Sequence, residues 1–496
     1  MKASPALHGP TREALPFGLM SALDLSSADA DEALRLRERF GFLREIVDEM
    51  ERSVPYASAL IRFSNGQSID LRDGEQSASR NDPQSGVVLT ASNGHSLEES
   101  ASDAIDADSI RHAARELVER VLHHRPDGPE PDLAIQADGP GDGDFATPVI
   151  VDPRSVSLTE RIARYEAIRQ RLRALDDRAV QATAIHREGS QVSIFANRSG
   201  MTTQQIRRVV LLLQLFVSDG QQRHFDLVIK AGTGGLELLE VSEAELAECA
   251  ATAGSLLSAG SIAAGTYDVI ADPLTTGTIA HEAFGHGVET DMFVKERARA
   301  AEYVGQRVGS ELVDIYDDPT VPAGYGSYFV DDEGQRANGT TIIRHGVFQR
   351  GITDLYSATR LGIPRSANGR RESVQRKAYA RMSNTFFGAG GSTLEELISG
   401  LDDGLLVCRS LNGMEDPKDW GIQIWANFAR EIKHGRLTGT IFSPIALTGY
   451  VPDLLADVSG ASDTIEWSSG SCGKGWKEIV PVGSGGPYLR TRCRLG

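Results

Sequence analysis

Two histidines and a glutamate near the middle of the chain are residue types that metal-dependent hydrolases use. His281 and His286 are separated by the sequence Glu-Ala-Phe-Gly, so that Glu282 directly follows the first histidine. In the His-Glu-x-x-His helix of zinc proteases the two imidazoles are four residues apart and project from one face. Here they are five residues apart, which on a regular α-helix separates the side chains by roughly 140°. An unbroken α-helix would therefore keep the two rings from reaching one ion.

A local departure from α-helical geometry would bring the two rings together. Gly285 and Gly287 flank His286 and make such a departure inexpensive, since glycine tolerates unusual dihedral angles. Either a π-bulge widens the turn, or the helix ends at Gly285 and His286 approaches from the following loop. Without a metal, both histidines would be packing or capping residues. We predict a break in the helix near Gly285.

A cysteine close to the C-terminus is the candidate third ligand. Cys472 lies in the segment 469–475, whose glycines and serines indicate a flexible loop, and Lys474 follows it closely. Thiolate is the metal-binding form of cysteine, and a neighbouring cation or a metal favours that form. Together with His281 and His286, Cys472 would make a zinc site with an open fourth position, as catalytic zinc sites require.

Glu282 is next to a ligand without needing to be one. A bound zinc would lower the pKa of a water and polarise a substrate carbonyl. Glu282 would take the proton of that water and hand it to the leaving amine, first as general base and then as general acid. Glu289, three residues after His286, and Asp291 are rival third ligands, although Glu289 could instead cap a helix or form a salt bridge.

Composition excludes several classes of protein. The chain has 496 residues and a formal net charge of −18, which argues against nucleic acid as the main partner because phosphate binding needs a basic surface. An acidic surface would instead favour cationic or neutral peptides. The longest apolar run, 209–217, is far shorter than the roughly 20 residues of a membrane span, and residues 1–30 lack a signal-peptide pattern. Four cysteines do not make a disulfide framework, so we predict a cytoplasmic protein that binds no nucleic acid and no membrane.

The helices and strands expected along the sequence, which must position these residues, indicate an α+β fold. Units of mixed helix and strand come first, and a large β-rich domain carrying the metal-binding helix follows. We predict an N-terminal arm over 1–30, a first α+β unit over 31–125, a linker over 126–150, a second α+β unit over 151–238, and the β-rich domain over 239–496.

Local signals predict several turns and helix starts. Ser64-Asn65-Gly66 is typical of a hairpin turn between two short strands, and Glu188-Gly189 is typical of another turn. Ser157 with Glu160, and Ser242 with Glu245, have the spacing of capping boxes that begin helices.

Five blocks of sequence resemble the TldD/PmbA family of metalloproteases, in its motif-bearing, TldD-like branch. They occur in one order and lie within residues 260–490. The blocks are His281-Glu282-Ala283-Phe284-Gly285-His286-Gly287-Val288-Glu289, Val330-Asp331-Asp332-Glu333-Gly334, Asn368-Gly369-Arg370-Arg371-Glu372-Ser373, Arg381-Met382-Ser383-Asn384-Thr385, and Cys472-Gly473-Lys474 followed by Val480-Pro481-Val482-Gly483.

The resemblance implies a zinc peptidase in which the two motif histidines and the late cysteine hold the metal and the motif glutamate is catalytic. These roles carry over to His281, His286, Cys472 and Glu282. It also implies substrates that are unfolded proteins or ribosomally made peptides undergoing leader removal or trimming. The chain would form a homodimer, or a heterodimer with a related TldE/PmbA-like subunit that lacks the motif.

One family block has an open role. Arg370 and Arg371 would bind substrate carboxylates, stabilise an oxyanion, or form a structural ion pair with Glu372, and of these roles we favour the structural one. The chain also departs from the family pattern at Trp476, at Gly486 and over 414–425, where the usual glycine-rich strand is absent. These departures leave the ligands intact and concern substrate preference.

The sequence therefore predicts zinc-dependent hydrolysis of peptide bonds in extended, unfolded peptides, held in part by backbone hydrogen bonds to a strand edge. Two alternatives remain: a non-catalytic binding subunit of a peptidase complex, and an amidohydrolase that acts on a small substrate.

Overall fold

The computed structural model describes residues 35–124, 141–475 and 477–496. The N-terminal arm expected over 1–30 and most of the linker expected over 126–150 lie outside these residues. The last part of that linker is described, and residues Gly143–Ala146 form a strand of the main sheet rather than a connection. No helix among the described residues combines the length and the apolar character needed to cross a membrane.

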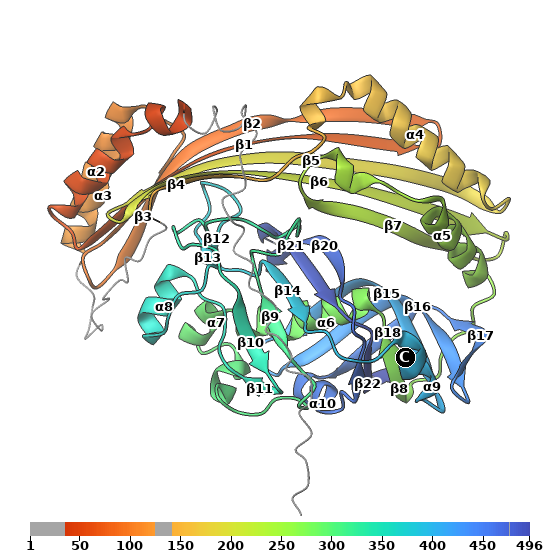
Figure 1. Cartoon of the computed structure of the whole chain (residues 1–496). Coiled ribbons are helices and arrows are strands. Elements are labelled where there is room, and N and C mark those ends of the chain that lie inside the picture. Colours follow the sequence, from red (N-terminus) through yellow and green to blue (C-terminus); the bar gives the residue numbers. More distant parts are fainter. Residues whose placement is uncertain (1–34, 125–140, 476) are drawn as a thin grey trace, which may run out of the picture.

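A long seven-stranded sheet forms the upper layer of the molecule (Figure 1). Its order is β3-β2-β1-β5-β6-β4, and β7 pairs with the remaining length of β6. The strands are β1 (Tyr56–Arg72), β2 (Glu75–Ser92), β3 (Leu97–Ser102), β4 (Gly143–Ala146), β5 (Ala179–Asn197), β6 (Gly200–Ser218) and β7 (Arg223–Thr233). Strands from the two expected α+β units, 31–125 and 151–238, thus share one sheet through the pairing of β1 with β5.

The two predicted turns inside this sheet are wrong. β1 and β5 run straight through Ser64-Asn65-Gly66 and Glu188-Gly189, and the two glycines, Gly66 and Gly189, lie opposite each other in the ladder. At Ser64-Asn65-Gly66 the register between β1 and β2 shifts, as a bulge between Ser64 and Gly66. Pairing on both sides of β1 satisfies its backbone groups, and this outweighs the local preference for a turn.

Helices pack on this sheet and contribute to its two hydrophobic cores. Helices α2 (Phe42–Glu51) and α3 (Ala107–His123) cover one end, and α4 (Leu158–Ala174) and α5 (Glu243–Leu256) pack at the other end (Figure 1). Both predicted capping boxes are confirmed, because Ser157 with Glu160 and Ser242 with Glu245 each make the two reciprocal bonds.

The lower layer consists of two further sheets with one helix between them. In one sheet, β15-β8-β22-β18-β16-β17, an additional pairing of β15 with β16 closes a ring of strands, and β19 pairs with β22. The second sheet has the order β11-β10-β9-β14-β21-β20. The strands are β8 (Gly265–Ala271), β9 (Ile315–Asp317), β10 (Thr340–Arg344), β11 (Val347–Phe348), β14 (Asn384–Phe387), β15 (Asp403–Asp416), β16 (Gly421–Lys433), β17 (Arg436–Phe442), β18 (Ile445–Tyr450), β19 (Gly460–Ala461), β20 (Glu466–Lys474), β21 (Lys477–Gly486) and β22 (Leu489–Leu495).

The remaining elements are short. They are the small pair β12 (Gly369–Arg370) and β13 (Tyr379–Ala380), the helices α7 (Thr290–Val294), α8 (Leu355–Leu361), α9 (Leu394–Ser399) and α10 (Val451–Ala456), and the 3₁₀ turns at Pro153–Ser155, Leu236–Leu239, His286–Val288 and Arg299–Tyr303. The observed fold is α+β with a β-rich C-terminal part, as predicted.

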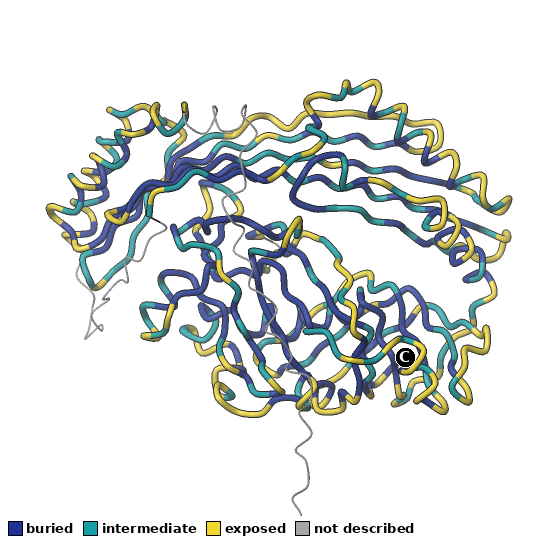
Figure 2. The backbone as a smooth tube through the Cα atoms, in the orientation of Figure 1, coloured by how far each residue is buried: buried dark blue, intermediate teal, exposed yellow. Residues whose placement is uncertain are grey.

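Helix α6 (Pro273–Phe284) lies at the centre of the lower layer and carries the histidine motif. It packs against β21, β15 and β14, and Figure 2 shows buried positions concentrated around it and in the strands, with exposed positions on loops and outer helix faces. Most side chains of α6 are buried, which fixes its orientation in the core. The motif is therefore held by a rigid element.

Candidate metal centre

Helix α6 begins and ends at defined residues. Asp272 caps it by accepting a hydrogen bond of 2.8 Å from the Thr275 amide, and Pro273 occupies the first turn. Gly277 permits the backbone of β21 to approach closely, since an added Cβ would lie 2.9 Å from the Gly485 amide nitrogen. The helix is thus anchored to the strand that pairs with the cysteine-bearing strand β20.

The helix breaks where the spacing of the histidines predicts. The amide of Gly285 donates to the His281 carbonyl, α6 ends at Phe284, and His286 begins a 3₁₀ turn. The observed break follows the second of the two geometries, in which the helix ends and His286 approaches from the next segment. The change of direction brings the two rings to a centroid separation of 5.2 Å.

Cys472 comes from a strand, so the predicted flexible loop over 469–475 is wrong. Cys472 is in β20, opposite Val480 of β21, and only 6% of it is exposed. The glycines and serines of this segment adopt an extended conformation because β21 supplies hydrogen-bond partners along its length. The thiol is therefore held in a fixed position.

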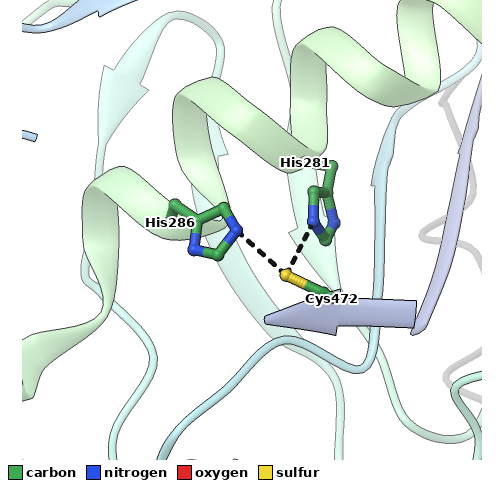
Figure 3. Close-up of side chains that lie close together, drawn as sticks. All are labelled: His281, His286 and Cys472. Atoms are coloured by element: carbon green, nitrogen blue, oxygen red, sulfur yellow. Dashed lines mark hydrogen bonds between the residues drawn. The ribbon is translucent and has the colours of Figure 1, made fainter. Parts of the chain in front are cut away.

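The three side chains converge on one point (Figure 3). Cys472 Sγ lies 3.2 Å from His281 Nε2 and 2.9 Å from His286 Nε2. The three ligand atoms lie within 4.8 Å of one another. Within the described ranges, the buried Nδ1 of His281 has no hydrogen-bond partner.

Electrostatics favours the thiolate. Burial alone would raise the pKa of Cys472, but the neighbouring charges and hydrogen bonds of His281 and His286 lower that pKa to about 5. Burial acts to lower the pKa of His286, and the thiolate, with Glu289, raises it well above the ordinary value. Arg381 also donates a hydrogen bond of 3.0 Å from Nη2 to Sγ.

Glu289, the rival ligand, lies on the other side of His286. Its Oε2 is 3.5 Å from His286 Nδ1, whereas the Nε2 of that ring faces Cys472. Its carboxylate is also bound by Arg381 Nε at 2.9 Å and by Lys474 Nζ at 3.0 Å. Asp291, the other rival, is bound by Lys474 at 2.6 Å. Both carboxylates are thus engaged with basic side chains.

Glu282 lies beside the cluster and packs against β15. Only 8% of Glu282 is exposed, and a Cβ added to Gly413 would lie 2.6 Å from its Cγ and 3.0 Å from its Oε1. The absence of a side chain at Gly413 therefore leaves the space that the carboxylate group of Glu282 needs.

The three candidate ligands and Glu282 line a cavity of about 750 Å³. Residues 410–415 of β15 and 468–474 of β20 line it, and Leu212, Leu227 and Ile229 of the upper sheet face it. In the described chain, β20 pairs only with β21, and this part of β15 pairs only with β16. Each strand thus retains one backbone edge free to accept another strand.

The sequence analysis assigned no function to two residues that lie at the site. Arg381 belongs to a family block, and it is fully buried between Cys472 and Glu289. Glu415 lines the cavity. It lies in the segment 414–425, and the departure of this segment from the family pattern was the only feature of the sequence that pointed to it.

Arg370 and Arg371 lie outside this cavity. Arg370 donates to the carbonyls of Met382 and Pro481, the latter at 2.8 Å, and Arg371 pairs with Glu99 of the upper sheet at 2.7 Å. Both side chains are buried. The ion pair of Arg371 is with Glu99 and not with Glu372, and both arginines line a separate small pocket.

The chain is similar to known metallopeptidases. Residues 264–493 match the PmbA/TldA metallopeptidase C-terminal domain. A metalloprotease of Methanothermobacter thermautotrophicus is 32% identical over 321 residues, which cover 64% of this chain and 69% of that protein. A zinc metalloprotease TldD homolog of Saccharolobus solfataricus is 28% identical over 230 residues, 46% of this chain and 51% of that protein.

The fold is also known from solved structures. TldE from Thermococcus kodakarensis superposes with a TM-score of 0.69 at 17% identity, over 90% of this chain and 99% of that chain. The likeness covers both layers, although at this identity it concerns the fold alone. With the matching C-terminal domain and the identity to the archaeal metalloprotease, this chain belongs to the TldD/PmbA family of metallopeptidases.

Proposed function

We propose that this protein is a zinc-dependent peptidase that hydrolyses peptide bonds in unfolded or ribosomally made peptides. The observation that carries the proposal is the convergence of His281, His286 and Cys472 in one cavity with Glu282. The two alternatives, a non-catalytic binding subunit and an amidohydrolase on a small substrate, explain Glu282 and the size of the cavity less well. A binding subunit needs no general base, and a small substrate needs less space.

The donor set fits zinc. Two imidazole nitrogens and one thiolate with an open position are a common set for catalytic zinc. The lowered pKa of Cys472 favours its thiolate form. The carboxylate of Glu289 lies 3.5 Å from the Nδ1 of His286. Histidine ligands of zinc commonly have such a carboxylate next to their other ring nitrogen. Zinc, when bound by His281, His286 and Cys472, supplies Lewis acidity that polarises a carbonyl and lowers the pKa of a water.

Glu282 is the residue that moves protons. Its carboxylate takes a proton from the attacking water and delivers it to the amine nitrogen that leaves when the peptide bond breaks. Burial against Gly413 holds the carboxylate in one place beside the ligands. Arg381 and Lys474 act indirectly, because they hold the Cys472 thiolate and Glu289 in position.

The free strand edges offer a way to hold an extended peptide. A peptide between β15 and β20 would pair its backbone with an edge of the cavity, a mode that depends little on side-chain identity. This arrangement suits unfolded peptides, whose backbone groups are available. We also propose that the protein acts as a homodimer or as a heterodimer with a TldE/PmbA-like subunit, as its family membership suggests.

Adding one methyl group at Gly413 tests the placement of Glu282. We expect Gly413→Ala to lower kcat by up to about a hundredfold, because the new Cβ overlaps the Glu282 side chain and displaces it. Zinc content should not change. Gly421→Ala on the neighbouring strand is the matched control, since a Cβ there meets no atom within 4 Å. Equal kcat for the two variants would contradict the role of Gly413.

Digestion of unfolded peptides of several lengths tests the proposed function. We expect the zinc-loaded protein to cleave long peptides, chelation to abolish cleavage, and added zinc to restore it; mass spectrometry of the products gives the readout. Cleavage of the shortest substrates alone would favour the amidohydrolase. Tight peptide binding without cleavage would favour the binding subunit.

A further inference from the structure

Glu415 is a carboxylate on the wall of the cavity for which the proposed mechanism has no use. It lies two residues after Gly413 on β15, and alternate residues of a strand point to the same face. Gly413 packs against Glu282, whereas Glu415 packs next to the 3₁₀ turn, where a Cβ added to Gly287 would lie 2.8 Å from its Oε1. Gly413 and Glu415 thus lie on the face of β15 that packs against the motif residues 282–287.

The carboxylate of Glu415 has no partner within the described ranges. Both of its oxygens are buried and neither accepts a hydrogen bond. Burial raises the pKa of Glu415 to about 9; His286 opposes this rise, and Glu282 adds to it. A buried carboxyl group whose oxygens accept no hydrogen bond lowers stability, so a bound donor would stabilise it.

The basic side chains near the cavity are already engaged elsewhere. Lys474 binds Glu289 and Asp291, Arg381 binds Glu289 and Cys472, and Lys295 binds Asp291 at 2.9 Å. Glu289 and Asp291 are therefore paired with cations of the chain. Glu415 differs from them because its partner is missing.

The buried indole N–H of Trp420 also lacks a hydrogen-bond partner among the described residues. Trp420 is fully buried, and the structure gives its Nε1 no acceptor among the described residues. That nitrogen and the Glu415 carboxylate adjoin the same glycine, since a Cβ added to Gly287 would lie 3.2 Å from Trp420 Nε1. An unsatisfied acceptor and an unsatisfied donor thus flank one position beside the cavity.

We propose that Glu415 forms a substrate subsite that binds a cationic group, an ammonium or a guanidinium, close to the bond that is cleaved. The group comes from the substrate, because Lys474, Arg381 and Lys295 are paired with other acceptors of the chain. Two residues along a strand correspond to about 7 Å, so the cation belongs to a residue within about two positions of the scissile bond. The Glu415 carboxylate would receive such a group through a charge-assisted hydrogen bond.

This assignment rests on the proposed peptidase function and refines its substrate class. The overall charge of −18 agrees with a preference for basic peptides, although surface charge alone gives no position. Glu415 also lies in the segment that departs from the family pattern. The subsite would therefore be a specialisation of this chain.

A binding experiment tests the subsite without depending on cleavage. The protein carries Glu282→Gln, so that bound peptides stay intact, and is loaded with zinc. Calorimetry then compares three pentapeptides: a capped one with a central lysine, a capped one with norleucine, and a norleucine peptide with a free N-terminus. We expect a cationic peptide to bind at least about tenfold more tightly than capped norleucine. Preference for the free N-terminus would identify the α-ammonium as the source, and preference for lysine would identify the side chain.

Variants of two acidic residues give the matched comparison. Glu415→Gln should abolish the preference for the cationic peptide, whereas Asp419→Asn, which removes an exposed charge in the following turn, should keep it. Glu415→Gln should not lower the Tm, because it removes an unpaired buried carboxylate, and Glu415→Met serves as a second variant with no acceptor. Equal binding of the three peptides, or a preference that survives in both Glu415 variants, would overturn the subsite. A preserved preference in the Glu282→Gln protein, together with no cleavage by the zinc-loaded protein that retains Glu282, would overturn the peptidase function and leave the subsite.

Discussion

Replacing Glu282 with glutamine is expected to lower kcat for peptide cleavage by about 10²-fold to 10⁴-fold, the usual contribution of a positioned general acid–base. Glutamine has nearly the shape of glutamate and fits against Gly413, but it cannot accept a proton from water. Zinc content, measured by elemental analysis, should remain that of the unchanged protein. The combination of retained metal and lost turnover separates proton transfer from metal binding.

The control for this variant is a glutamate that touches neither metal nor cavity. Glu395 is exposed on α9, so Glu395→Gln should retain full turnover. If Glu282→Gln kept both its zinc and its cleavage rate, the assigned mechanism would be wrong. Loss of zinc together with activity would instead assign Glu282 to the metal.

Replacing Cys472 with serine is expected to remove most of the bound zinc and with it the peptidase activity. A hydroxyl at pH 7 is a poor replacement for a thiolate whose pKa is lowered to about 5 by His281 and His286. Loss of a direct ligand should cost more than the roughly 10-fold to 100-fold in affinity that loss of a second-sphere partner costs. Zinc titration against a competing chelator measures the change.

Cys408→Ala is the matched control, because Cys408 is also buried but lies in an apolar cluster on β15. Burial raises the pKa of the Cys408 thiol well above its usual value, so it does not supply a thiolate. Cys472→Ser leaves Arg381 without one of its acceptors, and circular dichroism should therefore accompany the titration. Undiminished zinc in the serine variant would remove Cys472 as a ligand and make Glu289 the candidate again.

Local signals determined the features that depend on neighbours in the sequence. The five-residue spacing of the histidines, with Gly285 and Gly287, predicted a break in α6 at its observed place. The capping boxes at Ser157 and Ser242 were also predicted, since a cap involves only residues within one turn. The sequence blocks identified the family, and they paired Cys472 with a helix almost two hundred positions earlier.

Only the tertiary structure decided features that depend on distant strands. Gly66 and Gly189 look like turns in isolation, but β1 and β5 pair at these residues and remain extended. The segment around Cys472 looks like a loop, but β21 pairs with it and turns it into a strand. Arg371 meets Glu99 of another layer, and the two buried carboxyl oxygens of Glu415 lie next to Gly287 of the motif segment. The sequence by itself predicted a candidate set of metal ligands, and the pairing of β20 with β21 decided where Cys472 lies. Backbone hydrogen bonds between strands outweigh weak local turn preferences.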